Sequence, residues 1–165
     1  MQISTLEPSR YVDVVRNSPF LPKYSVFPSD RAPRLREKVR VVIVDDDPFF
    51  RSLLKVMLTQ AGLHDAEIRE AEDSDQALGM CRRDPVDLIF CDLNLPAFRS
   101  MNGLDIIREL RYVIPDVPMY MVTADNTQDL IERVRAVGAT GHILKPISLR
   151  TLKRLLLSNF GPTSN

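Results

Sequence analysis

Carboxylate, hydroxyl and ammonium side chains follow short apolar runs at several places in this sequence. The residues concerned are Asp45, Asp46, Asp92, Thr123 and Lys145. Carboxylates packed together repel one another unless a cation joins them, and an all-oxygen cluster with room for water suits Mg²⁺. A lysine and a hydroxyl beside such a cluster neutralise the oxygens of a transferring phosphoryl group while one carboxylate attacks phosphorus. These residue types therefore predict a site for phosphoryl chemistry.

The elements that must position these side chains are the strands of a parallel sheet. Short apolar runs alternate with helical patterns from Val39 onward, which is typical of successive βαβ units. Ligands of such sheets bind beyond the carboxyl ends of the strands. Asp92 is the expected nucleophile, because it follows the most apolar central run and lies between the other two groups. We expect strands at 39–44, 66–70, 86–91, 118–122 and 141–144, and helices at 48–61, 74–82, 103–112, 128–137 and 148–160.

The helix expected at 48–61 begins beside the acidic residues, with Pro48 in its first turn. Asp47 is expected to face solvent in that turn, where its charge favours the helix dipole. Ser148 is expected to cap the last helix. The inner stripe of the first helix is expected to hold Phe50, Leu53, Leu54, Met57 and Leu58.

The same residues carry a resemblance to the response-regulator receiver family of two-component signalling, in its chemotaxis-regulator-like form. That family has an acidic pair after the first strand, an aspartate after the third, Thr or Ser after the fourth and Lys-Pro after the fifth. The pattern appears here, in order, as VDDDP (44–48), CDLNLP (91–96), VTA (122–124) and LKP (144–146). The resemblance covers 39 to about 160. It implies an α/β fold: a doubly wound, five-stranded parallel sheet, flavodoxin-like in its strand order 2-1-3-4-5, with helices on both faces.

The resemblance also implies roles for the acidic residues. Asp92 accepts a phosphoryl group from a sensor histidine kinase or a histidine phosphotransfer protein. Asp46 and Asp92 ligate Mg²⁺ directly, together with the backbone carbonyl of Asn94, and Asp45 acts through a bound water. Such a protein is a signalling switch rather than an enzyme, since it catalyses only its own phosphoryl transfer and autodephosphorylation.

Further roles are implied for the residues after the fourth and fifth strands. Thr123 donates its hydroxyl to the phosphoryl group, and the backbone amide of Ala124 assists. Lys145 pairs with another phosphoryl oxygen. The peptide bond between Lys145 and Pro146 is expected to be cis, which is tolerable before proline.

The sequence departs from the family pattern at His142. This residue stands three positions before Lys145, where the family often carries a switch Tyr or Phe that turns inward as the threonine moves. An imidazole either does the same or stays solvated, and both interpretations remain open. If His142 turns inward, burial favours its neutral form and the switch becomes sensitive to pH.

A second departure is a longer loop beside the acceptor. The segment PAFRSMNG runs from Pro96 to Gly103 and adds Phe98 and Arg99. It is either a spacer, or it brings Arg99 over the phosphoryl group or Phe98 to a docking kinase. In this family the residues two beyond the acceptor and two beyond the threonine influence hydrolysis. Here they are Asn94 and Asp125, polar groups able to hold an attacking water, so the resemblance implies a short-lived phosphoryl state.

The composition argues against several classes of partner. The chain has 165 residues, a formal net charge of zero and 44% hydrophobic residues. No apolar run approaches the roughly 20 residues of a transmembrane helix, and the N-terminus has no secretory pattern. Cys81 and Cys91 are too few for a disulfide framework. We therefore expect a cytoplasmic protein that itself binds neither nucleic acid nor membrane.

The chain is expected to divide at Lys38. Residues 1–38 contain five of the twelve prolines, so we expect a loosely ordered N-terminal arm, with an arm docked on this domain or a partner as the alternative. Residues 39–160 are expected to form the receiver domain and residues 161–165 a tail.

The expected function is a binding switch. Phosphorylation on Asp92 changes a face made of the 128–137 helix, His142 and the 148–160 helix, which contacts an unidentified downstream protein or a second copy of the chain. Three alternatives remain: a receiver that docks partners without phosphorylation, a receiver cut from a larger DNA-binding or cyclic-dinucleotide regulator, and a haloacid-dehalogenase-like phosphatase. The last places its nucleophile after the first strand, whereas Asp92 follows the third.

Overall fold

One parallel sheet organises the described part of the chain. The computed structural model describes residues 38–95 and 101–161, so residues 1–37, the Phe98–Arg99 loop and the end of the tail lie outside the described residues. Within the described ranges the sheet has five strands in the order β2-β1-β3-β4-β5, all parallel. This order confirms the expected flavodoxin-like sheet. The strands are β1 (Arg40–Val44), β2 (Glu67–Ala71), β3 (Leu88–Asp92), β4 (Met119–Thr123) and β5 (Gly141–Leu144).

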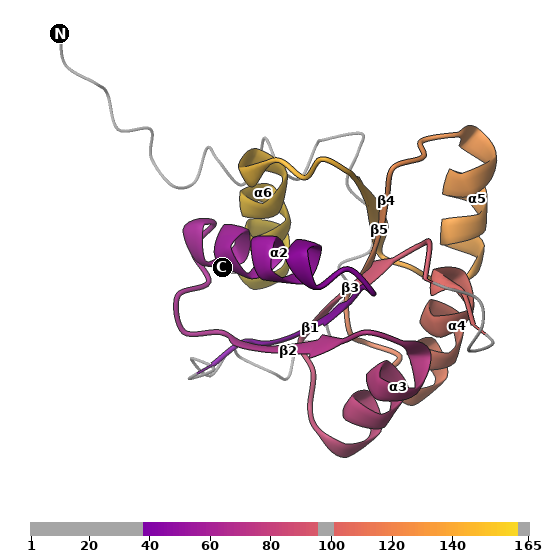
Figure 1. Ribbon diagram of the computed structural model, residues 1–165, viewed down its shortest axis with the longest axis horizontal. Coiled ribbons are helices and arrows are strands. Elements are labelled where there is room, and N and C mark those ends of the chain that lie inside the picture. Colours follow the sequence, from indigo (N-terminus) through magenta and orange to yellow (C-terminus); the bar gives the residue numbers. More distant parts are fainter. Residues whose placement is uncertain (1–37, 96–100, 162–165) are drawn as a thin grey trace, which may run out of the picture.

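Helices cover both faces of the sheet, which confirms the doubly wound class. α2 and α6 pack on one face, and α3, α4 and α5 pack on the other (Figure 1). Among the described helices, none combines the length and apolar character needed to cross a membrane. The helices are α2 (Pro48–Gln60), α3 (Ser74–Arg83), α4 (Gly103–Val113), α5 (Gln128–Ala136) and α6 (Leu149–Phe160).

Successive residues of a strand alternate between two hydrophobic cores. In β1, Val42 and Val44 face the core under α3, α4 and α5, whereas Val41 and Ile43 face the core under α2 and α6. Every residue of β3 and β4 is buried, as expected for parallel strands covered on both faces. Full burial of one such aliphatic side chain contributes about 1.5–3 kcal/mol. The two central strands are therefore a rigid support for the polar residues at their ends.

A polar side chain caps the N-terminus of each described helix. The expected cap at Ser148 is confirmed, since its hydroxyl accepts from the Thr151 amide. Asp47 faces solvent as expected, but its carboxylate accepts from the Phe49 amide at 2.9 Å, so it is the N-cap of α2 rather than a residue of the first turn. The reason is that Pro48 is favoured at the first helical position, which makes the preceding residue the cap. The full set of caps is Asp47, Asp73, Asn102, Thr127 and Ser148.

The expected inner stripe of α2 is wrong at Leu53. Leu54 and Leu58 are buried, whereas Leu53 is 43% exposed. Neighbouring residues of a helix point about 100° apart, so Leu53 cannot share the direction of Leu54 and Leu58. It lies instead on the flank of α2, where it lines an apolar groove with Ile147.

β3 and β4 each end one residue later than the sequence predicts. Asp92 pairs with Val122, and Thr123 pairs with Leu144, in the register of the sheet. Both polar residues are therefore the last residues of their strands rather than the first residues of loops. Their backbone positions are set by the sheet, which makes them rigid positions for a functional site.

Gly103 brings the start of α4 against the end of β3. Its amide donates a hydrogen bond to the Leu93 carbonyl at 3.2 Å. A Cβ atom at Gly103 would overlap the carbonyl oxygen of Asp92 and would lie 2.9 Å from the Cα atom of Leu93. Backbone atoms cannot yield as a flexible side chain can, so this close approach requires glycine.

Gly103→Ala should lower the free energy of unfolding by about 1–3 kcal/mol, the usual cost of forcing extra atoms into a packed site. Gly79→Ala is the matched control, because a Cβ atom there meets only the end of the Arg83 side chain at 3.7 Å. Within a helix that change should raise the free energy of unfolding by up to about 1 kcal/mol. Urea unfolding of both variants tests this, and equal effects at the two glycines would contradict the packing argument.

Candidate functional site

Four polar residues lie at the carboxyl edge of the sheet. Asp45 follows β1, Asp92 ends β3, Thr123 ends β4 and Lys145 follows β5. Because the strands are parallel, their carboxyl ends lie at the same edge. The structure therefore brings together residues that lie up to one hundred positions apart in the chain.

Lys145 joins the two buried carboxylates of this edge. Its Nζ atom lies 2.7 Å from Asp92 Oδ1 and 3.1 Å from Asp45 Oδ2. Asp45 and Asp92 are only 2% and 5% exposed, so the site buries two carboxylates against one ammonium group. Backbone amides satisfy the remaining oxygens: Asp47 N donates to Asp45 Oδ1 at 2.9 Å, and Asn94 N donates to Asp92 Oδ2 at 2.7 Å.

The charges of the cluster shift the pKa values of two of its members. Burial raises the pKa of Asp45, and the hydrogen bonds from the Asp47 amide and Lys145 only partly offset it. Burial lowers the pKa of Lys145, but its hydrogen bonds to Asp92 and Asp45 outweigh burial and raise the pKa overall. The hydrogen bonds to the two carboxylates therefore favour the charged form of Lys145, whereas burial disfavours the ionised form of Asp45.

The donors of this edge suit a hard cation. Carboxylate and carbonyl oxygens are the ligands that Mg²⁺ prefers, and the buried excess of negative charge favours an added cation. Within the described ranges, however, no three Asp, Glu, His or Cys side chains form a metal-binding group. Lys145 contacts Asp45 and Asp92 directly, while Asp46 and Asn94 are exposed beside them.

Thr123 and His142 are both held by the β4–α5 connection. Thr123 is fully buried, and its hydroxyl oxygen accepts from the Asp125 amide at 3.0 Å. His142 Nε2 lies 3.2 Å from Asn126 Oδ1. Ala124 is exposed between them, where its backbone borders the site. The peptide bond between Lys145 and Pro146 is cis.

Two residues of α2 also contact the site, although sequence reasoning gave them no role there. Arg51 Nη1 donates to the backbone carbonyl of Asp45 at 2.6 Å, and Arg51 Nε pairs with Glu70 at 3.0 Å. Lys145 Nζ lies over the ring of Phe50, 4.0 Å from its centroid. Their position could have indicated this role, because both lie in the first turn of a helix that begins directly after the acidic residues.

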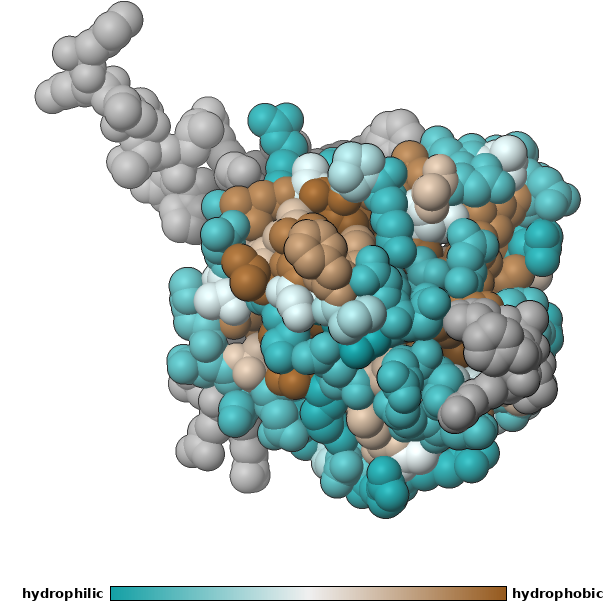
Figure 2. Space-filling model, in the orientation of Figure 1, coloured by the Kyte–Doolittle hydropathy of each residue, from teal (hydrophilic) through white to brown (hydrophobic). Residues whose placement is uncertain are grey.

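An apolar surface adjoins this cluster. Figure 2 shows hydrophobic side chains gathered over α2, where Phe49 is 74% and Val56 is 55% exposed. The groove beside them is lined by Phe50, Leu53, Leu54, Met57, Lys145, Pro146 and Ile147. The charged site therefore opens next to an uncovered apolar face.

A doubly wound parallel sheet with aspartates, a threonine and a lysine at its carboxyl edge is the arrangement of a known class of signalling module. The family model described as the response regulator receiver domain matches residues 41–157, so the chain belongs to that family. Receiver domains are signalling switches of two-component systems, and phosphorylation and Mg²⁺ binding are typical of them.

Individual relatives agree with this membership. The chain is 30% identical to chemotaxis protein CheY-3 of Vibrio cholerae over 124 residues, which are 74% of this chain and 92% of the relative. It is 35% identical to transcriptional regulatory protein AruR of Pseudomonas aeruginosa over 117 residues, which are 68% of this chain and 46% of AruR. The solved structure of chemotaxis protein CheY4 of Vibrio cholerae at pH 4.0 matches with a TM-score of 0.65 and 28% identity, covering 74% of this chain and 99% of that one.

Asp45→Asn should stabilise the metal-free protein at neutral pH. Because the folded-state pKa of Asp45 lies above its ordinary value, ionising this residue costs stability above that pKa, and the cost disappears as the pH falls through it. The advantage of the variant should therefore shrink on acidification. Chemical unfolding in the presence of a chelator, at several pH values from neutral to acidic, measures it.

Glu70→Gln is a control that should change stability in the opposite direction. The hydrogen bond from Lys55, with that from Arg51, lowers the pKa of Glu70, so its contribution is present above the ordinary pKa and is lost as the pH falls. Glu70→Gln should destabilise at neutral pH, and its penalty should shrink on acidification. Destabilisation by both variants at neutral pH would show that the folded protein does not disfavour the ionised form of Asp45.

Proposed function

We propose that this protein is a phosphorylation switch that accepts a phosphoryl group on Asp92 from a sensor histidine kinase or a histidine phosphotransfer protein. The observation that carries the proposal is the buried Asp92 carboxylate, held 2.7 Å from the Lys145 ammonium and beside Asp45 at the end of the central strand. The unit that performs this function is the receiver domain at 39–160. Family membership supports the proposal, because receivers act through downstream targets after phosphorylation.

The transfer itself needs little from the protein beyond positioning and charge. A carboxylate oxygen of Asp92 forms a bond to phosphorus, while the bond from phosphorus to the donor's histidine nitrogen breaks and that nitrogen keeps the electron pair. Lys145 exchanges its bond to Asp92 for one to a phosphoryl oxygen. Asp46, Asp92 and the carbonyl of Asn94, with Asp45 through water, would hold Mg²⁺, which when bound neutralises the phosphoryl oxygens.

Thr123 and His142 supply the conformational part of the switch. The Thr123 hydroxyl oxygen accepts from the Asp125 amide, which leaves the hydroxyl proton to donate to a phosphoryl oxygen, with the Ala124 amide as a second donor. Reorientation of the Thr123 side chain toward the phosphoryl group draws the β4–α5 connection inward through its bond to the Asp125 amide. His142, bonded to Asn126 in that connection, moves with it. The face formed by α5, β5 and α6 then differs between the two states and selects the downstream protein.

The lifetime of the phosphoryl group depends on water at the same edge. Asn94 and Asp125 are exposed beside Asp92 and Thr123. The Asp125 carboxylate accepts from the Thr127 amide at 2.9 Å, which fixes it near the site. Polar groups held there can orient a water that attacks phosphorus. We therefore infer that the phosphorylated state is short-lived.

Incubation of the wild-type chain with acetyl phosphate and Mg²⁺ should add one phosphoryl group to the intact protein. Asp92→Asn should abolish the adduct, because an amide oxygen is a poor nucleophile, and removal of Mg²⁺ should also prevent it. Asp116→Asn, at an exposed aspartate outside the site, is the matched control and should keep full uptake. Intact-protein mass spectrometry measures each sample. An adduct that persists in Asp92→Asn would place the acceptor elsewhere.

Addition of beryllofluoride and Mg²⁺ should change the environment of the His142 ring. The chain has two histidines, so His64, exposed between α2 and β2, serves as an internal reference in imidazole NMR spectra. The His142 signals should shift in the wild type, while those of His64 stay in place. Thr123→Val keeps the shape but lacks the hydroxyl, and it should suppress the His142 shift. An equal shift in that variant would remove Thr123 from the switch.

A further inference from the structure

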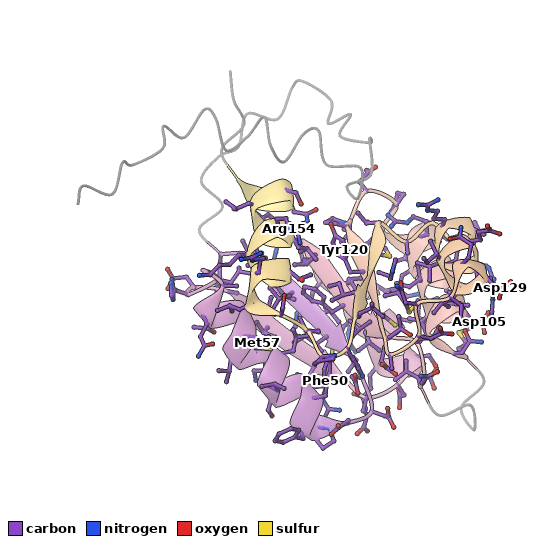
Figure 3. All side chains as sticks on the ribbon, turned by 90° about the horizontal axis from the view of Figure 1, so that it is seen from above. Phe50, Met57, Asp105, Tyr120, Asp129 and Arg154 are labelled. Carbon is purple, nitrogen blue, oxygen red and sulfur yellow. The ribbon has the colours of Figure 1, made fainter. Side chains whose placement is uncertain are left out.

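We infer that Phe50 is a positioning residue for Lys145, holding its ammonium group at the acceptor site by a cation–π contact. Lys145 Nζ lies over the Phe50 ring at 4.0 Å from its centroid, well inside the range of about 6 Å over which this attraction acts. Figure 3 shows Phe50 beside the turn that joins β5 to α6, where Lys145 begins that turn. The consequence for phosphoryl transfer rests on the function proposed above.

The contact completes the surroundings of the ammonium group. An ammonium has three N–H donors, and two of them serve Asp92 at 2.7 Å and Asp45 at 3.1 Å. The Phe50 ring supplies a third interaction, from α2 rather than from the sheet. Lys145 is therefore held between the carboxylates of the sheet edge and an aromatic face on the adjoining helix.

This third contact differs from the other two because it does not involve a carboxylate. It therefore does not depend on the chemical state of Asp92. When Asp92 is phosphorylated, Lys145 must exchange a carboxylate oxygen for a phosphoryl oxygen. The ring keeps the ammonium in place during that exchange, so less order has to be created in the transition state.

The position of Phe50 favours this role over core packing alone. Phe50 is only partly buried, at the edge of the core under α2 and α6, and it also borders the open groove. An aliphatic residue there would fill the same edge of the core but would offer no π face to Lys145. The exposed neighbour Phe49 is of the same residue type on the same helix turn, so it provides a control with identical chemistry.

The test compares Phe50→Leu, Phe50→Tyr and Phe49→Leu in phosphoryl uptake from acetyl phosphate at low donor concentration and saturating Mg²⁺. A small donor excludes effects on partner docking. Loss of a partly exposed cation–π contact should slow uptake by Phe50→Leu roughly two- to five-fold. Phe50→Tyr keeps the π face and should retain the wild-type rate, as should Phe49→Leu. Equal rates for Phe50→Leu and Phe49→Leu, or equal losses in Phe50→Leu and Phe50→Tyr, would overturn the inference.

Two further measurements separate positioning from simple loss of packing. In a Lys145→Met background, Phe50→Leu should cause no further loss of rate, because the group it positions is gone. In NMR spectra of the resting protein, the Hε protons of Lys145 should carry an upfield ring-current shift that disappears in Phe50→Leu and persists in Phe50→Tyr. If the wild type takes up no phosphoryl group, the proposed function fails, and the ring-current shift alone decides whether Phe50 holds Lys145.

Discussion

The ion-pair cluster of Lys145 with Asp45 and Asp92 is the interaction on which the arrangement of this edge depends. Burying a carboxylate is costly unless a cation and hydrogen bonds compensate it. Asp45 and Asp92 are both nearly inaccessible, and the ammonium that joins them comes from the far side of β4. Neighbouring strands lie about 4.8 Å apart, so β5 is roughly 10 Å from β3, a span suited to the longest unbranched cationic side chain.

The cluster contains one ammonium group and two carboxylates, so its charges do not balance when both carboxylates are ionised. Burial, with a smaller contribution from the neighbouring Asp92, raises the pKa of Asp45, and one ammonium faces the two buried carboxylates. Such a pocket favours the arrival of a divalent cation, and a cation in turn favours an anionic phosphoryl group. The imbalance therefore makes the resting state receptive to the ligands of the proposed reaction. Packing of the central strands offsets the cost of maintaining it.

α2 contributes more to the site than its place outside the sheet suggests. Asp47 caps the helix and donates its amide to Asp45, Arg51 binds the Asp45 carbonyl, and Phe50 covers the Lys145 ammonium. These contacts come from the first turn, so the helix start and the acidic residues form one local unit. A displacement of α2 would therefore alter the acceptor site directly.

The fold class of this protein and most members of its candidate site could be predicted from the sequence alone. Alternating apolar runs and helical patterns identified the parallel sheet, because the periods of strands and helices differ and both faces of the sheet must be covered. The polar residues at strand ends identified Asp45, Asp92, Thr123 and Lys145 as neighbours, because parallel strands share one carboxyl edge. Sequence reasoning was wrong at Leu53, which lies off the buried stripe of α2, and it placed Asp47 in the first turn instead of at the N-cap.

Only the tertiary structure decided which groups touch. Lys145 pairs with both Asp45 and Asp92, Asp46 stays outside that group, and Phe50 on α2 meets the Lys145 ammonium that follows β5. Such contacts depend on side-chain directions and on distances between elements far apart in the chain. A one-dimensional pattern records residue types and spacing but not these relations. The sequence by itself therefore determined the fold class and the members of the site, and packing decided how their charges are shared.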